Sequence, residues 1–431
     1  MKNLITLLIA ISFLSACSKE DSKIADNQNI TSKLKSVTLP TIPSATFNIT
    51  SYGAVSSSTV DNTSAIQKTI NACSSAGGGI VVIPSGTFLC GPITMANKTN
   101  LQISSGATLK ALPYGTYPNS GSTSTMSNFI YGSGLSNIEV SGSGTIDGQG
   151  SAWWTAYNAN SSIKRPCLIR FNTCTNIEIT GIKIINAPNV HITIGSGSNS
   201  STISGITITA PSTSPNTDGI DIWSGNVNVT NCKIACGDDN IAMDNNSEYI
   251  NITGCTFGVG HGCSIGSYTA SVDHVTVDNC TFSATTSGIR MKSNRTRGGT
   301  DQYLSYSNIT MTNVPNPIYI TSYYPSTPSS PSSDPAQTVT STTPNWKHIT
   351  LTNITITGST NAGILWGLPE LSISDIIFDN VKISASKGMT ANFVSGAVFK
   401  NGSSITVSSG NAITTYNASI SGINLTTGKA Q

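Results

Sequence analysis

The chain repeats one short pattern of hydrophobic and polar positions. An apolar, a polar and an apolar residue are followed by two mostly small or polar residues, then by a small or apolar, a polar and an apolar residue. Alternation with a period of two predicts short strands, and the small residues at a fixed place predict a corner between two of them. Clear copies begin at Ile177, Val227, Ile250 and Val275, and looser copies begin at Leu101, Ile138, Ser201, Leu304, Ile349 and Ile376.

The spacing of the copies predicts how they stack. Between Ile177 and Leu304 they begin 24, 26, 23, 25 and 29 residues apart, a period typical of solenoids. Two short strands joined by a corner cannot bury a face alone, so each coil must stack on the next at a spacing of about 4.8 Å. We therefore expect an all-β fold, a single right-handed parallel β-helix, over residues 47–431.

Three cysteines occupy one template position on successive copies, namely Cys232, Cys255 and Cys280. Stacked Cβ atoms point alongside one another, so this column is expected to be buried and to consist of thiols. With Cys17 set aside, nine cysteines remain, an odd number that leaves at least one unpaired. The pairs Cys73–Cys90 and Cys167–Cys174 are possible, and the sequence decides neither.

A short helix is expected to cover the N-terminal end of the solenoid, since open sheet edges invite aggregation. Ile66, Ile70 and Cys73 recur at helical spacing, Asp61 or Thr63 can cap the start, and Gly77 to Gly79 follow the end. A strand is expected over residues 80–83.

The N-terminal residues carry the pattern of an export signal. Lys2 precedes an apolar run from Leu4 to Ala16, which is too short to span a bilayer and suits a signal peptide. Leu14-Ser15-Ala16-Cys17 resembles the bacterial lipobox, which predicts a lipoprotein signal peptide over residues 1–16 and lipidation of Cys17. Residues 17–46 are polar and are expected to be a flexible tether. The implied location is the outer membrane or surface of a Gram-negative bacterium; the alternative is an ordinary secretory peptide.

Composition narrows the class of protein further. Only 10% of the residues are charged and 39 are glycine, which disfavours a helical enzyme. The 22 basic and 20 acidic residues give a net charge of +2, so the chain lacks the basic excess of a nucleic-acid-binding protein. We expect a monomer with no nucleic-acid partner.

Polar residues follow the strands of four consecutive copies, where a packed coil does not require them. These residues are Asn216-Thr217-Asp218, Asp238-Asp239, His261, and Arg290 with Lys292. Stacking of the coils would bring them to one wall, where a cleft would carry three carboxylates, one imidazole and two cations. Arg290 and Lys292 share a face if their segment is extended, and such a pair suits a substrate carboxylate.

These residues resemble the marks of the family 28 glycoside hydrolases, the polygalacturonases that cut pectin. The marks stand in the family's order as Asn216-Thr217-Asp218, Gly237-Asp238-Asp239, Gly260-His261-Gly262 and Arg290-Met291-Lys292. Gly144 to Gly150, Ser264 to Ser267 and Asn316-Pro317-Ile318 are also similar to family segments. Met291 departs from the usual Ile, an apolar exchange without chemical consequence.

The resemblance implies hydrolysis of α-1,4-galacturonosyl bonds by the inverting route, without a cofactor or metal. Asp238 would be the general acid, Asp218 and Asp239 the bases that hold the water, and His261 a group that tunes a carboxylate. Crowding of the carboxylates raises the cost of ionising all of them, so one is expected to keep its proton near neutrality. Asn216, Arg290, Lys292 and Tyr324 would bind the polysaccharide, with Tyr323 as the alternative to Tyr324.

Two other functions fit parts of the pattern. Asp221 and Asp244 add carboxylates that would suit calcium, and calcium-dependent pectate lyases share the β-helix. A surface adhesin or glycan-binding solenoid would show the same repeat and export signal. The sequence also leaves open whether the Ser-, Thr- and Pro-rich segment 325–344 shapes the cleft or is disordered, and whether cleavage occurs within the polymer or from an end.

Overall fold

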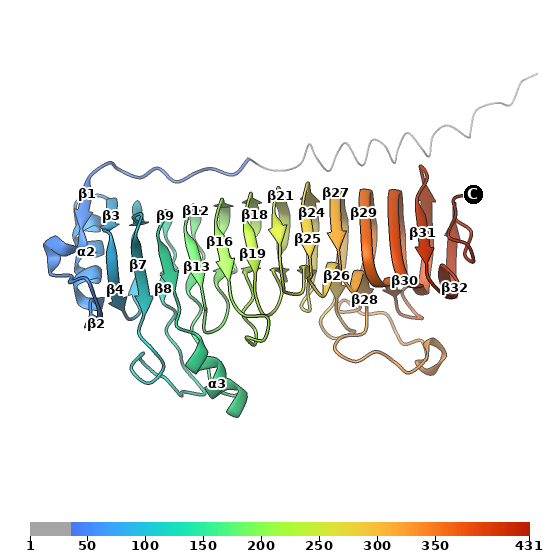
Figure 1. Ribbon diagram of the computed structural model, residues 1–431, viewed down its shortest axis with the longest axis horizontal. Helices are drawn as coiled ribbons and strands as arrows, with labels where there is room; N and C mark the ends of the chain where they lie inside the picture. Colours follow the sequence, from blue (N-terminus) through green and yellow to red (C-terminus); the bar gives the residue numbers. More distant parts are fainter. Residues whose placement is uncertain (1–35) are drawn as a thin grey trace, which may run out of the picture. The chain divides into compact units, whose positions relative to one another are not determined.

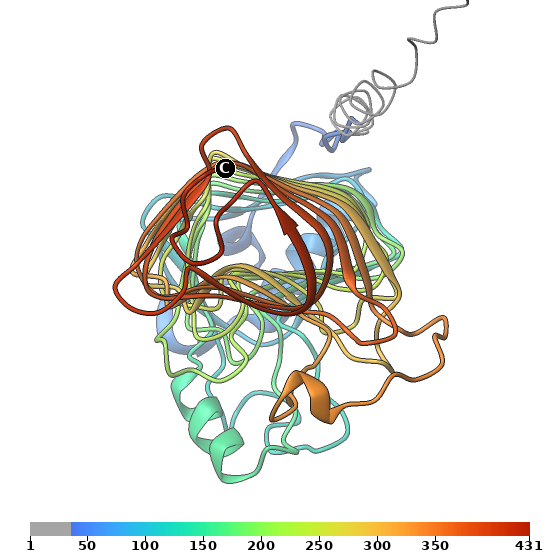
Figure 2. The ribbon, with the colours of Figure 1, turned by 90° about the vertical axis from the view of Figure 1, so that its right-hand side faces the viewer.

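The computed structural model describes residues 36–431, which form a stack of coils (Figure 1). Each strand pairs in parallel with the equivalent strand of the next coil, so three rows of strands run along the stack. The chain is a parallel β-helix, as the repeat predicts. Viewed along the stack, the coils enclose a common interior, while a helix and a long loop project from the same side (Figure 2).

The first row comprises β1 (Thr46–Asn48), β3 (Gly79–Ile83), β6 (Thr99–Ile103), β9 (Ser136–Gly142), β12 (Thr175–Thr180), β15 (Asn199–Ser204), β18 (Gly225–Thr230), β21 (Ser247–Thr253), β24 (Ser271–Asp278), β27 (Thr300–Thr312), β29 (Asn345–Trp366) and β30 (Ile373–Lys400). The second row comprises β2 (Ser57–Asp61), β4 (Gly86–Cys90), β7 (Ala107–Ala111), β10 (Thr145–Asp147), β13 (Lys183–Ile185), β16 (Thr207–Thr209), β19 (Lys233–Ala235), β22 (Thr256–Phe257), β25 (Thr281–Ser283) and β31 (Ser404–Val407). The third row comprises β5 (Ile93–Thr94), β8 (Ile130–Ser133), β11 (Ile169–Asn172), β14 (Ile192–Ile194), β17 (Ile220–Ile222), β20 (Ile241–Met243), β23 (Cys263–Ile265), β26 (Ser287–Lys292), β28 (Asn316–Thr321) and β32 (Ile413–Ser421). The long strands β27, β29 and β30 turn corners and serve more than one row.

The corner between the first and second rows explains the small residues in the repeat. Its backbone has a positive φ in eight successive coils, a conformation that only Gly and Asn adopt readily. These residues are Gly181, Gly205, Asn231, Gly254, Asn279, Asn308, Asn353 and Asn380. Alternate residues of the strands are buried in the interior, so the pattern of apolar positions sets which face is the core.

The interior contains ladders of like side chains. Phe257 packs on Phe282 with ring centroids 4.7 Å apart. Cys232, Cys255 and Cys280 are each 1% exposed and unbridged, which confirms the expected thiol column. All nine cysteines in residues 36–431 are free, so neither Cys73–Cys90 nor Cys167–Cys174 is a disulfide.

The start of the stack is covered by α2 (Thr63–Ser75), which buries Ile66, Ile70 and Cys73 as expected. The prediction of its cap was wrong by one residue, because Asn62 is the N-cap and its side chain bonds Val55 instead of the helix. Asp61 nonetheless accepts a hydrogen bond from the Thr63 amide at 2.9 Å. A 3-10 turn, η1 (Ile49–Tyr52), precedes the helix.

The register of the first copy also differs from the prediction. Ile138 pairs with Thr99, and Leu101 pairs with Val140, two residues away from the predicted match. A shift of two keeps the same side chains on the buried face, so alternation alone does not detect it.

Part of the segment expected to be a tether is described. Within residues 36–45, the amide of Thr41 donates to Asn137 Oδ1 at 3.0 Å and the amide of Thr38 donates to Ser200 Oγ at 2.6 Å. Cys17 and the expected signal peptide lie outside the described residues. Among the helices of residues 36–431, none is long and apolar enough to cross a membrane.

Candidate active site

The candidate residues lie just before or within the third-row strands of four stacked coils. Asn216 and Asp218 precede β17, Asp238 and Asp239 precede β20, His261 precedes β23, and Arg290 and Lys292 lie in β26. Because β17, β20, β23 and β26 pair in that order, residues up to 76 positions apart meet on one side of the stack. The stacking that the sequence predicts is confirmed.

Asp239 is the most constrained carboxylate of the site. Its Oδ1 accepts hydrogen bonds from Arg290 Nη1 at 2.6 Å and Ser264 Oγ at 2.6 Å, and its Oδ2 accepts one from Lys292 Nζ at 2.7 Å. The side chain is 4% exposed, so its negative charge is buried and balanced by two cations. The two basic residues therefore hold a catalytic candidate directly, a contact that the sequence did not predict.

Asp238 lies beside this cluster and contacts the imidazole. His261 Nδ1 is 2.9 Å from Asp238 Oδ1 and 3.7 Å from Asp239 Oδ1. Asn216 Nδ2 donates to the other Asp238 oxygen at 3.2 Å. Burial alone would raise the pKa of Asp238, but the interaction with His261 and the charges of Lys292 and Arg290 outweigh burial and hold the pKa below its usual value.

The pKa values of the neighbouring carboxyl groups shift in the opposite direction. Burial, followed by the charges of Asp221, Asp238 and Asp239, raises the pKa of Asp218 well above its usual value. Burial and the charge of Asp244 likewise raise the pKa of Asp221. The shifts run in the direction expected from crowding for Asp218, whereas the pKa of Asp238, the proposed general acid, shifts downward.

A buried histidine fixes the backbone beside Asp218. His191 Nδ1 lies 2.9 Å from the Asp218 carbonyl oxygen, so this nitrogen must carry the proton that is donated. Burial lowers the pKa of His191 to about 4, which keeps the ring neutral in near-neutral solution. Nothing in the sequence singles out His191, because a lone His in a turn has no distinctive spacing.

The glycines on either side of His261 are required by close packing. Gly260 has a φ of +140°, and a Cβ there would lie 2.5 Å from Asn240 Oδ1. Gly262 has a φ of +83°, and a Cβ there would lie 2.2 Å from the Ser287 carbonyl oxygen. Both contacts are impossible for a real Cβ, so the turn that presents His261 needs glycine at both places.

Of the two tyrosines considered for substrate binding, Tyr324 is the one at the site. Lys292 Nζ lies 5.1 Å from the centre of its ring and the Arg290 guanidinium lies 5.9 Å away. Tyr323 is 7% exposed and donates its hydroxyl to Asp334 Oδ2 at 2.6 Å, so it anchors the adjoining segment. Tyr324 therefore adjoins the basic pair, whereas Tyr323 holds Asp334.

Arg165 supports the site from a second loop and was not identified from the sequence. It follows α3 (Ser151–Ala159), is 8% exposed, and its guanidinium lies 3.7 Å from the ring centre of Tyr157. It donates to the carbonyl oxygens of Pro188 at 2.9 Å and Pro215 at 2.5 Å, and to Asn216 Oδ1 at 2.9 Å. The sequence offered one signal for Arg165, namely that basic residues are rare in a chain of which only 10% is charged.

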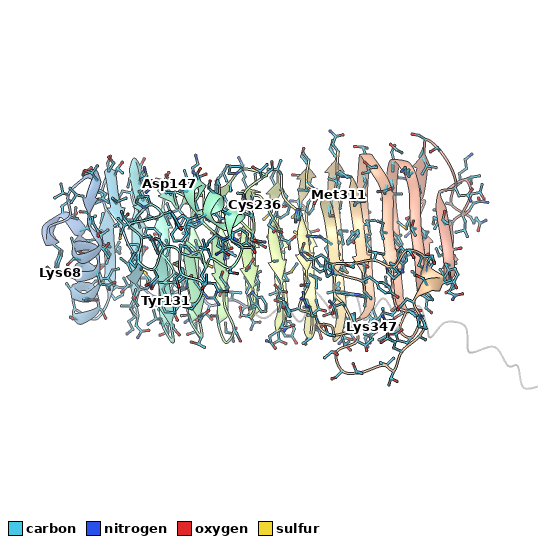
Figure 3. All side chains as sticks on the ribbon, turned by 90° about the horizontal axis from the view of Figure 1, so that it is seen from below. Lys68, Tyr131, Asp147, Cys236, Met311 and Lys347 are labelled. Carbon is cyan, nitrogen blue, oxygen red and sulfur yellow. The ribbon has the colours of Figure 1, made fainter. Side chains whose placement is uncertain are left out.

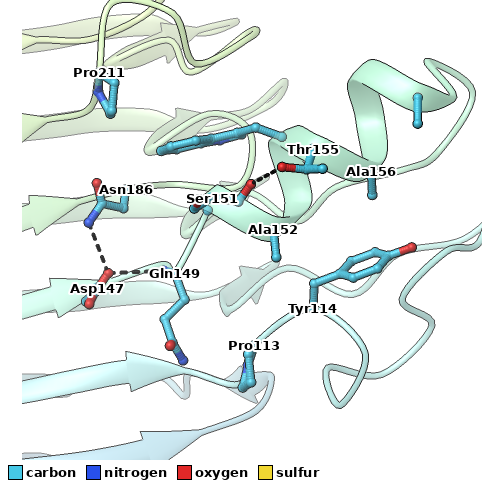
Figure 4. Close-up of a pocket in the computed structure, with 13 residues that line it drawn as sticks. Pro113, Tyr114, Asp147, Gln149, Ser151, Ala152, Thr155, Ala156, Asn186 and Pro211 are labelled. Carbon is cyan, nitrogen blue, oxygen red and sulfur yellow. Dashed lines mark hydrogen bonds between the residues drawn. The ribbon is translucent and has the colours of Figure 1, made fainter.

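One cavity is lined by none of these residues. It is an open groove of about 990 Å³ between α3 and the turns that follow the second-row strands. Its lining includes Asp147, Gln149, Trp154 and Asn186 (Figure 4). Seen from the side on which α3 projects, Asp147 lies toward the opposite edge from Tyr131 of the third row (Figure 3). None of the predicted site residues is among the residues that line this groove.

Comparison with known proteins agrees with these marks and with the fold. The sequence model described as Glycosyl hydrolases family 28 matches residues 73–405, which include every residue of the site. The chain belongs to this family.

Relatives within family 28 extend over most of the chain. An endo-polygalacturonase of Pectobacterium carotovorum subsp. carotovorum is 33% identical over 354 residues, which cover 75% of this chain and 84% of that protein. An exopolygalacturonase of Zea mays is 31% identical over 364 residues, covering 80% and 85%. A probable polygalacturonase of Arabidopsis thaliana is 36% identical over 286 residues, and the match spans 61% of that protein's length.

Solved structures of polygalacturonases share the architecture. The polygalacturonase from Erwinia carotovora ssp. carotovora superposes with a TM-score of 0.65 at 28% identity, covering 90% of this chain and 99% of that one. An exopolygalacturonase from Thermotoga maritima superposes with a TM-score of 0.73 at 20% identity, covering 95% and 99%. The fold is the right-handed parallel β-helix.

The geometry of the site residues also shows whether they suit a calcium ion. Asp238, Asp239 and His261 offer ligand atoms within 4.8 Å of one another, the only such group in residues 36–431. Calcium requires six to eight oxygen ligands, whereas three acceptor positions of Asp239 are already occupied by Arg290, Lys292 and Ser264. Two fixed cations at the same carboxylate oppose a divalent ion electrostatically, so the site does not fit the calcium-dependent alternative.

Proposed function

We propose that this family 28 chain is a polygalacturonase that hydrolyses the α-1,4-galacturonosyl linkages of pectate. The single observation that carries the proposal is the contact of Arg290 and Lys292 with Asp239, next to Asp238 and His261. One arrangement thus combines a proton-transfer group, an ionised carboxylate and a cationic patch, which an acidic polysaccharide requires for both binding and cleavage.

In this mechanism Asp239 and Asp218 hold the attacking water. Asp239 supplies a carboxylate that contacts two cations, and three of its roughly four lone-pair positions are occupied. One position remains to accept a hydrogen bond from water. The pair of cations carries one positive charge more than Asp239 neutralises, and this excess attracts the carboxylate of the sugar.

Asp238 protonates the glycosidic oxygen and must therefore acquire a proton when the substrate binds. The uronate carboxylate offsets the charges of Arg290 and Lys292, and the sugar excludes water from the cleft. Both changes remove stabilisation of the ionised form and raise the pKa of Asp238. Binding of the acidic substrate thus creates the general acid.

The test is a time course of products from polygalacturonate, with Asp238→Asn as the matched variant. Saturated oligomers or monomer are expected from the native chain, and turnover should fall by about a hundred- to ten-thousand-fold in the variant. Unsaturated uronides absorbing in the ultraviolet, together with loss of activity on chelation, would identify a lyase. Native protein that binds the polymer without cleaving it would identify a glycan-binding solenoid.

We also propose export and lipidation at Cys17, supported by the apolar run and the lipobox-like residues Leu14 to Cys17. The proposed substrate is an extracellular polysaccharide, which is consistent with this location. A Cys17→Ser variant should lose incorporation of labelled fatty acid and leave the membrane fraction. Unchanged membrane association of that variant would contradict the anchor.

A further inference from the structure

The open groove beside α3 differs in charge from the cleavage site. Its volume of about 990 Å³ is at the upper end of the range for small-molecule sites. Among the residues of 36–431 that line it, Asp147 is the one charged side chain and none is basic. A uronate carries a negative charge, which Asp147 would repel. The groove therefore does not suit the acidic sugar proposed for the cleavage site.

The side of the groove formed by the coils is polar. Asp147 ends β10, and Asn186 follows β13 on the next coil (Figure 4). Asp147 Oδ1 accepts hydrogen bonds from the Gln149 amide at 3.1 Å and from Asn186 Nδ2 at 3.4 Å. These two contacts orient the carboxylate and leave its Oδ2 available for a donor on a ligand. A ligand hydroxyl would supply such a donor, in a short charge-assisted bond.

The opposite side is formed by α3, which carries no charged residue among its nine. Ser151, Ala152, Thr155 and Ala159 are exposed and line the groove. Exposed helix positions commonly carry long charged side chains, whereas these small ones leave the space beside the helix open. The groove is therefore bounded by hydroxyl groups and small apolar groups on this side.

Two aromatic residues complete the lining, and both are held in place. Trp154 Nε1 donates to the Ala187 carbonyl oxygen at 3.0 Å, and a Cβ at Gly150 would lie 2.5 Å from Trp154 Cζ2, so the indole packs directly on the Gly150 backbone. The Tyr114 ring packs edge-on against the buried Trp153 with ring centroids 5.0 Å apart. Fixed rings offer an apolar surface to the C–H groups of a ligand whose hydroxyls bond elsewhere.

We propose that this groove binds a neutral saccharide, with its hydroxyls on Asp147 and Asn186 and its C–H groups against Trp154. A sugar has both kinds of surface on one ring and brings no charge to be repelled by Asp147. The site is separate from the cleavage site and does not rest on the proposed function. A neutral branch on an acidic polysaccharide would bring such a ligand to the protein.

The test is a titration of the native protein with neutral oligosaccharides of galactose, arabinose and xylose. Binding is followed by calorimetry and by tryptophan fluorescence, with oligogalacturonate as the acidic probe and trilysine as the basic probe. We expect saturable binding of at least one neutral series, with a Kd of about 1 mM or tighter. Added sodium chloride should leave this affinity unchanged, because the ligand carries no charge to screen.

Three variants locate the binding. Ala152→Phe fills the groove from an exposed helix position and should weaken binding by about tenfold or more. Asn158→Phe is the matched control, because Asn158 is exposed on α3 and does not line the groove, and it should bind as the native protein does. Asp147→Asn keeps the Oδ1 acceptor and removes the charge, so it should also weaken binding by about tenfold. This variant gives an independent answer if Ala152→Phe does not fold.

Several outcomes would overturn the saccharide site. These are no saturable binding of any neutral series, unchanged affinity in both Ala152→Phe and Asp147→Asn, or binding of trilysine or oligogalacturonate alone that Ala152→Phe abolishes. Cleavage of polygalacturonate is a separate measurement, and Ala152→Phe should keep the native rate. Absence of cleavage by the native protein would overturn the proposed function and leave the saccharide site standing.

Discussion

The direction of one amide group at the site is set by a residue that can only donate hydrogen bonds. Arg165 has no acceptor, so Asn216 must turn its Oδ1 toward the guanidinium, at 2.9 Å. Its Nδ2 then faces Asp238 Oδ2, at 3.2 Å. Without Arg165, the Asn216 amide could rotate and present an oxygen to the carboxylate.

Replacing Arg165 by Met should therefore impair catalysis more than it impairs substrate binding. We expect kcat to fall by about tenfold or more, the size of one charge-assisted contact, with a smaller change in KM. Loss of the Asn216 donor also removes a bond that favours ionised Asp238, so the pKa of Asp238 rises and the alkaline limb of the pH–rate profile moves to higher pH.

The neighbouring exposed Lys164 provides the control. Lys164→Met should leave both the rate and the profile unchanged. If Arg165→Met lowers the thermal unfolding temperature and leaves the alkaline limb in place, Arg165 has only a structural role.

At this scale the sequence predicted which polar side chains would lie together but not which atoms would be in contact. The ordered marks and the coil period were enough to bring Asp218, Asp238, Asp239 and His261 together. The contact of Arg290 with Asp239 spans 51 residues and depends on the exact offset between stacked strands, which alternation does not encode.

Among the elements, the long segment between β28 and β29 is held in place by polar side chains. Tyr324, which immediately precedes residues 325–344, lies near Arg290 and Lys292, so we expect the segment to border the substrate instead of being disordered. Asp334 Oδ2 accepts hydrogen bonds from Arg295 Nη2 at 2.6 Å and from the Tyr323 hydroxyl at 2.6 Å. Arg295 in turn binds Glu370 through its Nε at 2.6 Å.

Asp334→Ala should release this loop. We expect cleavage within residues 325–344 by a broad-specificity protease to accelerate about tenfold or more, and KM for polygalacturonate to rise more than kcat falls. Thr338→Ala, at an exposed position of the same loop, is the control. Unchanged protease sensitivity of Asp334→Ala would show that other contacts hold the loop.

The loop should also respond to acid. The hydrogen bond from Arg295 lowers the pKa of Asp334, so this contact contributes stability at higher pH and loses it as pH falls through the lowered pKa. Native protein should therefore become protease-sensitive at this loop in acid, whereas Asp334→Ala should be equally sensitive at all pH values.

The elements themselves were largely predictable, and their ends were not. Strand periodicity and the corner residues located most coils, because Gly and Asn are needed where φ is positive. The cap of α2 and the pairing of Leu101 differed from prediction because each depends on a displacement of one or two residues, which tertiary contacts decide.

For the whole molecule, the buried carboxylates on one side of the stack lower the free energy of unfolding at neutral pH. Asp244 is 7% exposed, and burial raises its pKa to about 6 from an ordinary value of 3.8. A raised pKa stabilises the folded state below the ordinary pKa, and this contribution is lost as pH rises through about 6. The native protein at pH 8 therefore bears the cost of ionising a buried group.

Asp244→Asn should remove that cost while keeping the acceptor for the Tyr268 amide, which lies 3.0 Å from Oδ1. The variant should match the native protein below about pH 4 and be more stable at pH 8, by up to about 3 kcal/mol for a shift of two pKa units. Unfolding midpoints measured at both pH values test this. If the variant is less stable than the native protein at pH 8, the contacts of Asp244 stabilise its ionised form.

The confinement of the site residues to the four coils of β17, β20, β23 and β26 has an evolutionary consequence. Each coil contacts only its neighbours, so recombination between repeats can insert or delete one whole unit with little disturbance to the rest of the stack. Such an event outside these four coils would change the length of the stack and leave the clustered side chains in place. Insertion of a unit between two of the four coils would instead separate them.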